Sequence, residues 1–326
     1  VPQNTAATRS RAGRTGGRGE TREKGGGALP SVHGRKPQRL SVVDSSDVHV
    51  SVKTAAKYHD DRLSLLLLTW FQTLQPQQVH IVTDDGAMDY WTSTAEEFGF
   101  KVATADGCSV GHCRECLCCK SGVEYEQFYR ERDRRSHFKW FCHVDDDVYV
   151  NIHQLVILLH KYDPLTEKVY LGRWSLARTS KLQMRRNIPN LKSNEFAFGT
   201  GALYCISSCL MTELEPYFRG SQRFVSMCKL LQYTDDMTVG ATIESILGYN
   251  FTDVDLIFSE LHAISHIPAS KLPSLISISY GKNTLPGGGE IKRHVSIPQP
   301  QFTLDEDPTR FLSFHCLLYS STSWCR

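Results

Sequence analysis

Trp140-Phe141-Cys142-His143-Val144-Asp145-Asp146-Asp147 is the stretch that decides the fold of this 326-residue chain. A largely apolar run of strand length breaks there into three adjacent carboxylates. Tyr149-Val150 and a helical pattern follow, so the acids are expected on a loop between a strand and a helix. Open α/β sheets bind their ligands on such loops.

The three acids Asp145-Asp146-Asp147 repel one another, so a folded chain keeps them together only where solvent or a cation relieves the repulsion. Mg²⁺ and Mn²⁺ prefer carboxylate oxygens and leave positions for phosphate oxygens. The cluster therefore suits a metal that carries a nucleotide diphosphate. The alternative is a solvated acidic turn with an N-capping Asp, but the preceding strand favours a site.

The net charge of +2 hides an uneven distribution. Residues 1–40 hold nine basic and two acidic residues (+7), which leaves 28 basic and 33 acidic residues (−5) for the rest. A nucleic-acid binder normally carries its basic patch on the folded domain, so the composition argues against one. We expect residues 1–46 to be a disordered basic stem and 47–326 a single domain. The alternative for the stem is binding to nucleic acid or anionic membrane.

The cysteines and a glycosylation sequon indicate the cellular compartment of this protein, whereas its apolar segments do not. The longest strongly apolar stretch, residues 63–71, is too short to cross a bilayer, and no signal peptide is present. Because the sequence starts at Val1, we expect an N-terminal segment to precede it. Eleven cysteines indicate an oxidising compartment with at least one thiol left unpaired. Asn250-Phe251-Thr252 is an N-glycosylation sequon, typical of a luminal or secreted protein.

Alternating patterns predict a mostly parallel sheet flanked by helices. The polar stretch 175–194 is long enough to be a functional or mobile loop. In the aromatic and glycine-rich segment 196–202, small residues predict a close approach of the backbone to a ligand or a neighbouring strand. Strands are expected at 48–52, 79–82, 101–104, 140–144 and 169–172, and helices at 60–71, 88–97, 152–162 (capped by Asn151) and from 235 to 247.

Asp235 and Asp236 begin the last of these helices, where the helix dipole favours negative charge. Capping alone explains Asp235. It does not explain two adjacent carboxylates, so this pair is a second candidate site.

In this order, the elements resemble the Fringe family, the β-1,3-N-acetylglucosaminyltransferases that extend O-linked fucose on epidermal-growth-factor-like (EGF-like) repeats of Notch. The resemblance runs from about Val48 to Arg326, and its matches are collinear. They are Lys53-Thr54, Tyr58-His59-Asp60-Asp61-Arg62-Leu63, Trp140 to Asp147, Tyr149-Val150-Asn151, Asp235-Asp236, Asp307-Pro308, Arg310-Phe311, and the tail from His315-Cys316-Leu317-Leu318-Tyr319 to Trp324-Cys325.

The resemblance implies a disulfide-stabilised GT-A-type nucleotide-sugar transferase fold and a Mn²⁺-dependent, inverting transfer from UDP-N-acetylglucosamine to fucosylated EGF-like repeats of Notch-type receptors. It implies a Golgi-luminal type II membrane protein, or a secreted one after cleavage, that acts in developmental Notch signalling. Such a transfer needs a base for the acceptor hydroxyl and a cation for the departing diphosphate.

The resemblance also implies residue roles. Arg62 and Asp146 would contact the sugar nucleotide, Asp147 would bind Mn²⁺, and Asp236 would be the catalytic base. For Arg62, the alternative is a surface ion pair with Asp60 or Asp61. For Asp236, the alternative is an acid that only stabilises the N-terminal end of its helix. The implied disulfides are Cys108 with Cys119, Cys142 with Cys205, and Cys316 with Cys325, which leaves Cys113, Cys116, Cys118, Cys209 and Cys228.

The chain departs from the family at three places. Glu260 stands where Fringe has its late metal ligand, a His; glutamate also binds Mn²⁺, and a register shift would bring in His262 instead. The remaining alternative is that Glu260 is only a solvated loop acid. The segment Phe198 to Cys205 is one residue shorter, and Leu203 and Tyr204 are candidates to fill space that a sugar needs. Val148 replaces an Asn.

Three other interpretations stay open. One is a relative that binds sugar nucleotide or glycoprotein without turnover. Another is a metal-dependent phosphohydrolase, for which Asp145 and Asp147 have the required spacing. The last concerns Cys113 and Cys116, whose C-x-x-C spacing is that of a zinc site, although no second such pair follows.

Overall fold

The computed structural model describes residues 45–84, 86–135, 138–174, 179–182, 188, 191–259, 261–262, 264–284 and 290–325. They belong to one compact unit that comprises residues 32–326. The predicted stem, except for residues 45 and 46, and most of the 175–194 loop lie outside the described residues. Within the described ranges, no helix has both the length and the apolar character that a membrane crossing requires.

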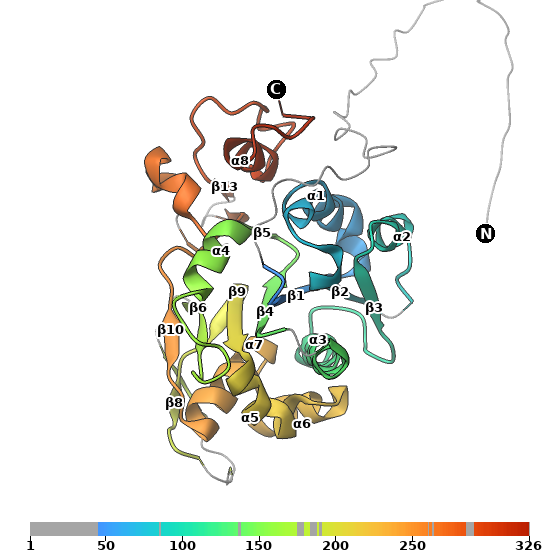
Figure 1. Cartoon of the computed structure of the whole chain (residues 1–326), viewed down its shortest axis with the longest axis vertical. Helices are drawn as coiled ribbons and strands as arrows, with labels where there is room; N and C mark the ends of the chain where they lie inside the picture. The colour runs from blue at the N-terminus through green and yellow to red at the C-terminus, as the bar shows by residue number, and fades with distance from the viewer. Residues whose placement is uncertain are drawn as a thin grey trace, which may run out of the picture. The chain divides into compact units, whose positions relative to one another are not determined.

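A seven-stranded sheet organises this unit, in the order β10-β6-β9-β4-β1-β2-β3 (Figure 1). Only β9 runs antiparallel to its neighbours in this sheet, β4 and β6; the other pairs are parallel, which confirms the predicted mostly parallel sheet. The strands are β1 (Val48–Lys53), β2 (Val79–Asp84), β3 (Lys101–Ala105), β4 (Trp140–Asp145), β6 (Tyr170–Trp174), β9 (Gly199–Ser207) and β10 (Phe251–Asp253).

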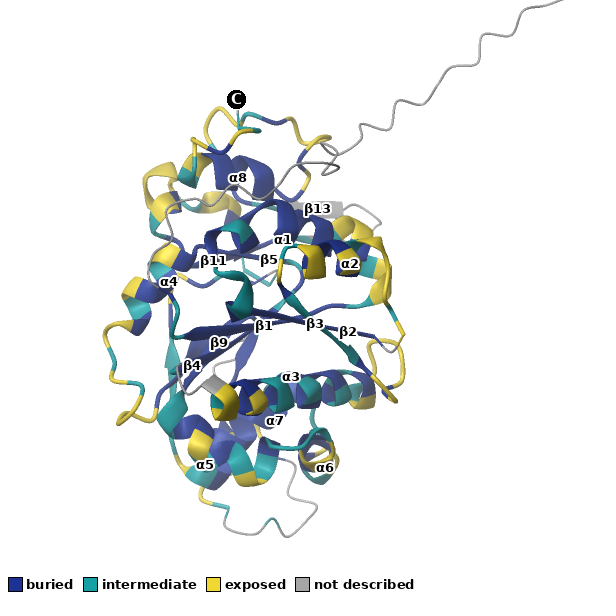
Figure 2. Ribbon diagram, turned by 45° about the vertical axis from the view of Figure 1, so that its right-hand side comes forward, coloured by how far each residue is buried: buried dark blue, intermediate teal, exposed yellow. Residues whose placement is uncertain are grey.

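Helices cover both faces of the sheet, as Figure 2 shows. One face carries α1 (Ser64–Leu68), α2 (Tyr90–Glu97), α4 (Ile152–Leu159) and α8 (Phe311–Leu318). The other carries α3 (Arg114–Arg135), α5 (Ser208–Phe218), α6 (Ser221–Leu231) and α7 (Asp235–Gly240). The sheet is therefore the middle of three layers, with a core on each side.

Shorter elements complete the described chain. Three strand pairs are β5 (Val148–Val150) with β11 (Ser277–Ser279), β12 (Gly281–Thr284) with β13 (Glu290–Arg293), and β7 (Ser180–Lys181) with β8 (Glu195–Phe196). The 3-10 turns are Ala56–Tyr58, Trp70–Thr73, Pro76–Gln78, Ile264–His266 and Ala269–Ser274, and the π-helical turns are His59–Leu63 and Ala241–Leu247.

The alternation within β1 assigns its side chains to the two cores. Val48, Val50 and Val52 join the core that includes α1, α4 and α8. The intervening residues face α3, where His49 stacks on His80 with ring centroids 4.0 Å apart. Because successive side chains of a strand point to opposite faces, the last residue of β1, Lys53, also lies on the α3 side.

Two predicted helices differ in extent. The predicted 60–71 helix is interrupted at Thr69, whose hydroxyl donates a 2.7 Å hydrogen bond to the carbonyl of Leu65. The Thr69 N–H donates to the same carbonyl at 3.1 Å, and a hydroxyl that shares an acceptor with the backbone in this way often bends a helix. The predicted 152–162 helix begins as expected after Asn151, which accepts from the Gln154 N–H, but it ends at Leu159. Pro164 follows shortly and disfavours a helical conformation for the residue before it.

The sequence patterns do not predict helix α3, because the spacing of its first cysteines is that of a metal site. The three disulfides that the resemblance implies are present. Two more join Cys113 to Cys116 and Cys118 to Cys228. With their sulfurs bonded to each other, Cys113 and Cys116 are not thiolate ligands, so the zinc interpretation is wrong. Cys209 is the free thiol that the odd count required.

Candidate active site

Lys53 joins the two acidic segments at the carboxyl ends of the parallel strands. Lys53 and Asp145 end β1 and β4 and are partners in the strand register. The Lys53 Nζ lies 3.3 Å from Asp145 Oδ1 and 2.5 Å from Asp235 Oδ2. The fold thus brings the loop after β4 to the start of α7, as the proposed chemistry requires.

Burial and charge act against each other at this contact. Burial by itself lowers the pKa of Lys53, but Asp145 and Asp235 outweigh it and raise that pKa well above the ordinary value. Burial raises the pKa of Asp235, but Lys53 holds it below the usual range. Both side chains are therefore charged at neutral pH. Since they are 9% and 7% exposed, removing one partner would leave a buried uncompensated charge.

His143 and Glu124 extend the charged row behind Asp145. His143 Nε2 lies 3.4 Å from Asp145 Oδ1, and its Nδ1 lies 2.9 Å from Glu124 Oε1. Burial lowers the pKa of His143, but Glu124 more than offsets this and the pKa rises to about 9. Burial raises the pKa of Asp145, yet Lys53 and His143 hold it well below its ordinary value. From Glu124 to Asp235, the charges alternate in sign.

Arg62 contacts the other two acids of the cluster. Its Nη1 donates to Asp146 Oδ1 at 2.6 Å and lies 3.4 Å from Asp147 Oδ2. Thr54 donates to the second oxygen of Asp146 at 2.7 Å. The guanidinium also lies 3.8 Å from the ring centroid of Tyr58. The structure thus brings together Arg62, Asp146 and Asp147. Among the described residues, the Arg62 side chain pairs with these acids, which are distant in the sequence, and not with its neighbours Asp60 and Asp61.

The three acids therefore divide between two sets of cationic side chains. Asp145 points to Lys53 and His143, whereas Asp146 and Asp147 point to Arg62. A phosphohydrolase needs Asp145 and Asp147 to converge on one phosphate, and this division does not favour that interpretation.

Asp236 is held through one of its two oxygens. The Thr234 hydroxyl and the Met237 N–H donate to Asp236 Oδ1 at 2.8 and 2.7 Å. Within the described part of the chain, these bonds leave Oδ2 as the oxygen available to take a proton. Burial and then the charge of Asp235 raise the pKa of Asp236 to about 6. Such a carboxylate is ionised at neutral pH and more basic than an ordinary Asp, as a general base should be.

Gly201 borders this site and explains the glycine-rich segment. A Cβ at Gly201 would lie 1.8 Å from Asp145 Oδ2 and 2.5 Å from its Cγ. No side chain fits there while Asp145 keeps its place, so the predicted close approach is confirmed. Leu203 and Tyr204 are buried in the cores on opposite faces of the sheet. They fill core volume and do not occupy a sugar site.

Among the expected metal ligands, Asp147 is the described residue that could supply a carboxylate to a metal ion. Asp147, with 22% of its side chain exposed, offers carboxylate oxygen of the kind that Mn²⁺ prefers. Ser279 donates to the Asp147 carbonyl at 2.8 Å, and Ile257 bridges to Ser277 of the same strand. The segment that ends at Ser259 therefore runs beside β11 towards Asp147. Glu260 itself lies outside the described residues.

His262 fits a metal ligand poorly. Its Nδ1 lies 3.1 Å from the Ser259 N–H nitrogen, and its Nε2 lies 3.3 Å from Nε of Arg173. A neutral imidazole has one acceptor nitrogen. In His262, hydrogen-bond donors lie next to both ring nitrogens, and the donor at Nε2 is the cationic Arg173, so neither nitrogen is open to a metal ion. Burial and then Arg173 lower the pKa of His262. Over the residues that are described, no group of three or more His, Cys, Asp or Glu is arranged to hold a metal ion.

Asn250 of the predicted sequon is exposed and immediately precedes β10, which is one of the two edge strands of the seven-stranded sheet. Its position is compatible with a glycan, because nothing in the described fold covers that side chain.

Sequence reasoning missed Lys53, His143 and Glu124 as members of the site. The first two had a signal, since each is a titratable residue that alternates with apolar residues at or near the carboxyl end of a strand. Glu124 had none, because it is supplied by the unpredicted helix α3.

Comparisons with known proteins place the chain in a family. The Fringe-like family model matches residues 43–322. Lunatic fringe of Xenopus laevis, a β-1,3-N-acetylglucosaminyltransferase, is 36% identical over 299 residues, which cover 91% of this chain and 74% of the relative. Human lunatic fringe is 35% identical over 301 residues, which cover 92% of this chain and 74% of the relative. Radical fringe of Notophthalmus viridescens is 37% identical over 284 residues, which cover 87% of this chain and 67% of the relative.

Among solved structures, the galactosyltransferase LgtC in complex with donor and acceptor sugar analogues has a TM-score of 0.36 at 10% identity, over 63% of this chain and 73% of that one.

The mainly parallel α/β sheet, the acidic cluster after β4 and these relatives define a glycosyltransferase. The chain belongs to the Fringe-like family.

Proposed function

We propose that this protein transfers N-acetylglucosamine from UDP-N-acetylglucosamine, in β-1,3 linkage and with inversion, to O-linked fucose on EGF-like repeats of Notch-type proteins. The observation that carries the proposal is the Lys53 contact to Asp145 and Asp235. In a Fringe-like chain, this contact brings the acids after β4 to the start of α7, where Asp236 has a raised pKa.

Asp236 acts as the base for the acceptor hydroxyl. Its Oδ1 is held by Thr234 and Met237, so the carboxylate has a fixed orientation and Oδ2 takes the proton. The elevated pKa supports this role because a base works best with a pKa near the working pH.

Arg62 and Asp146 bind the sugar nucleotide. The guanidinium is held by Asp146 and by the ring of Tyr58, and its planar fork of donors suits a diphosphate. Mn²⁺ would be held by Asp147 and Glu260, and when bound it would neutralise charge on the departing diphosphate. Because His262 faces Arg173 and Ser259, we favour Glu260 over His262 as the late ligand.

The setting we propose is the Golgi lumen, with membrane attachment through an N-terminal anchor outside this sequence or release by cleavage. Five disulfides support it, because such bonds persist in oxidising compartments. A single thiol, Cys209, remains.

The test is a transfer assay with purified protein, UDP-N-acetylglucosamine and an EGF-like repeat that carries O-fucose. The same repeat without fucose and UDP-galactose as donor are the controls. We expect transfer only with the fucosylated repeat, loss of transfer with a chelator and recovery with Mn²⁺. Titration of UDP with Mn²⁺ runs in parallel. Binding without turnover would mean a relative that has lost catalysis.

A further inference from the structure

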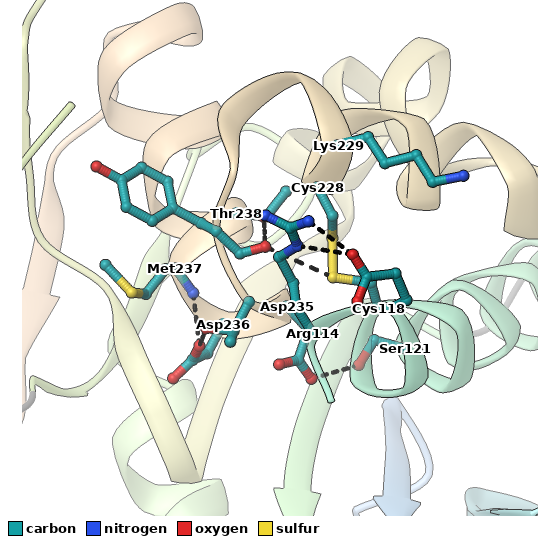
Figure 3. Close-up of a disulfide and its surroundings, with 12 residues drawn as sticks. Arg114, Cys118, Ser121, Cys228, Lys229, Asp235, Asp236, Met237 and Thr238 are labelled. Atoms are coloured by element: carbon teal, nitrogen blue, oxygen red, sulfur yellow. Dashed lines mark hydrogen bonds and ion pairs between the residues drawn. A yellow bond between two sulfur atoms is a disulfide. The ribbon is translucent and has the colours of Figure 1, made fainter. Parts of the chain in front are cut away.

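The disulfide between Cys118 and Cys228 connects α3 to α6 beside the start of α7, as Figure 3 shows. Its two Cα atoms lie 6.5 Å apart and the cysteines are separated by 110 positions. The helices also pack closely near it, since a Cβ at Gly122 would lie 2.7 Å from the Ser221 carbonyl oxygen. The bond thus joins two distant segments at a tight helix contact.

One face of α3 holds the connection between α6 and α7. Arg114, Cys118 and Ser121 follow at spacings of four and three, which places them on one side of the helix. Arg114 Nη1 donates to the Gln232 side chain at 3.1 Å, and Cys118 Sγ lies 3.7 Å from the Tyr233 carbonyl oxygen. Ser121 donates to Asp235 Oδ2 at 2.7 Å. Successive turns of α3 therefore contact successive residues that lead to Asp235 and Asp236.

The connection is short. Helix α6 ends at Leu231 and α7 begins at Asp235, so only residues 232–234 lie between them. Gln232 closes α6 in the left-handed conformation, with φ of 65° and its N–H bonded to the Cys228 carbonyl. Because each residue spans at most about 3.6 Å, the position of Cys228 restricts where Asp235 and Asp236 lie.

We propose that the Cys118–Cys228 disulfide is a positioning element for the reaction: it fixes the end of α6 on α3 and so holds Asp235 against Lys53 and Ser121 and Asp236 in its orientation. Its effect on turnover rests on the proposed function, in which Asp236 is the base. The bond acts through the connection and touches no substrate. Arg62 and Asp146 come from other elements, so donor binding is independent of it.

The chain supplies a matched control. Cys113–Cys116 lies at the start of the same helix but joins residues three positions apart. It links no second element. Removing it deletes a disulfide from α3 without releasing α6.

The experiment compares the parent with Cys118→Ala/Cys228→Ala and Cys113→Ala/Cys116→Ala, well below their unfolding temperatures. We expect the first variant to lose about tenfold or more in kcat, as misplaced catalytic groups do. Its KM for the donor should stay within about twofold of the parent value, since the residues that bind the donor are unchanged. The control variant should keep both parameters. A purely structural bond would lower the unfolding temperature and leave kcat unchanged.

Amide hydrogen exchange gives a readout that does not need turnover. Residues 235–240 should exchange faster in the Cys118/Cys228 variant than in the parent or the control, while β1 stays protected. If the parent has no transfer activity, the proposed function fails, and the exchange result still decides this inference. The inference would be overturned if the Cys118/Cys228 variant showed the same exchange of residues 235–240 as the parent. In an active parent, the variant would also have to show an unchanged kcat.

A second variant covers the case in which the double Ala protein does not fold. Two glycines inserted after Gln232 leave the disulfide intact but lengthen the connection. We expect the same loss of kcat and faster exchange of 235–240, whereas two glycines inserted after Gly220, between α5 and α6, should have a smaller effect. Equal effects of both insertions would contradict the role of the connection.

Discussion

Lys53 and Asp235 are 182 positions apart in the sequence, yet Nζ of one lies 2.5 Å from Oδ2 of the other. This contact joins the end of β1 to the start of α7. It also completes a row of alternating charges that runs from Glu124 through His143 and Asp145. The row sets the electrostatic surroundings of Asp236, the neighbour of Asp235.

Asp236→Asn should abolish most of the transfer. The amide keeps the shape of the side chain but cannot take the acceptor proton, so we expect kcat to fall by about 10²- to 10⁴-fold, the usual contribution of a general base. UDP binding should remain, because Arg62 and Asp146 are unchanged. Steady-state kinetics and UDP titration check this, with Glu195→Gln as an exposed control. Undiminished kcat would remove Asp236 as the base.

The acidic limb of the pH profile should move in opposite directions in two variants. Burial and Asp235 raise the pKa of Asp236 to about 6, and Lys53 lowers it. Asp235→Asn removes the negative neighbour, so the pKa of Asp236 should fall and activity should persist to lower pH. Lys53→Met removes the positive neighbour, so the pKa of Asp236 should rise and activity should be lost at higher pH than in the parent. Profiles of kcat against pH measure both, and shifts of the same sign would refute this electrostatic account.

Gly201→Ala should act through Asp145. The new Cβ would lie 1.8 Å from Asp145 Oδ2, which forces that carboxylate away from Lys53 and His143 and lowers kcat. If this is the mechanism, the substitution should cost much less in an Asp145→Ala background, where the obstacle is gone. A double-mutant cycle on kcat and on unfolding free energy measures the coupling. Fully additive effects would mean that Gly201 matters for another reason.

His143 should make stability depend on pH. Its pKa in the folded protein is about 9, above the value near 6.5 for an unfolded chain. Its stabilising contribution is therefore complete below about pH 6.5 and is lost as the pH rises through about 9. The loss should be on the order of 1–3 kcal/mol. Denaturant unfolding between these pH values checks it.

The matched controls for this prediction are two substitutions. His143→Gln should remove most of the loss, whereas His153→Gln, at an exposed position, should leave it unchanged. If the unfolding free energy depended on pH in the same way in the parent and in His143→Gln, groups other than His143 would cause the loss of stability.

The late metal ligand can be decided by binding alone. We expect Glu260→Ala to weaken Mn²⁺ affinity by at least about tenfold, or roughly 1.4 kcal/mol. His262→Ala should change it little, because donors from Ser259 and Arg173 already face both ring nitrogens. Electron paramagnetic resonance of free Mn²⁺ measures the affinity without turnover. A larger loss in His262→Ala would reverse the assignment, and no loss in either would exclude both residues.

Much of the fold could be predicted from local patterns. The alternation in 48–52 and the apolar run 140–144 gave strands that the structure confirms with ends shifted by a residue. Asn151 capped its helix as predicted. Helix α3 could not be predicted, because its cysteines have the spacing of metal ligands. Only the packing of α3 against α6 shows that Cys118 pairs with Cys228.

The sequence alone determined the chemistry that is available: three acids after a buried strand, a second acidic pair at a helix start, and a collinear resemblance to Fringe. These follow from residue order, because strand period and loop position are local properties. Only the tertiary structure decided which acid faces which cation, that Gly201 must lack a side chain, and that Cys118 pairs with Cys228. Those facts depend on contacts between distant segments, and local periodicity carries no information about them.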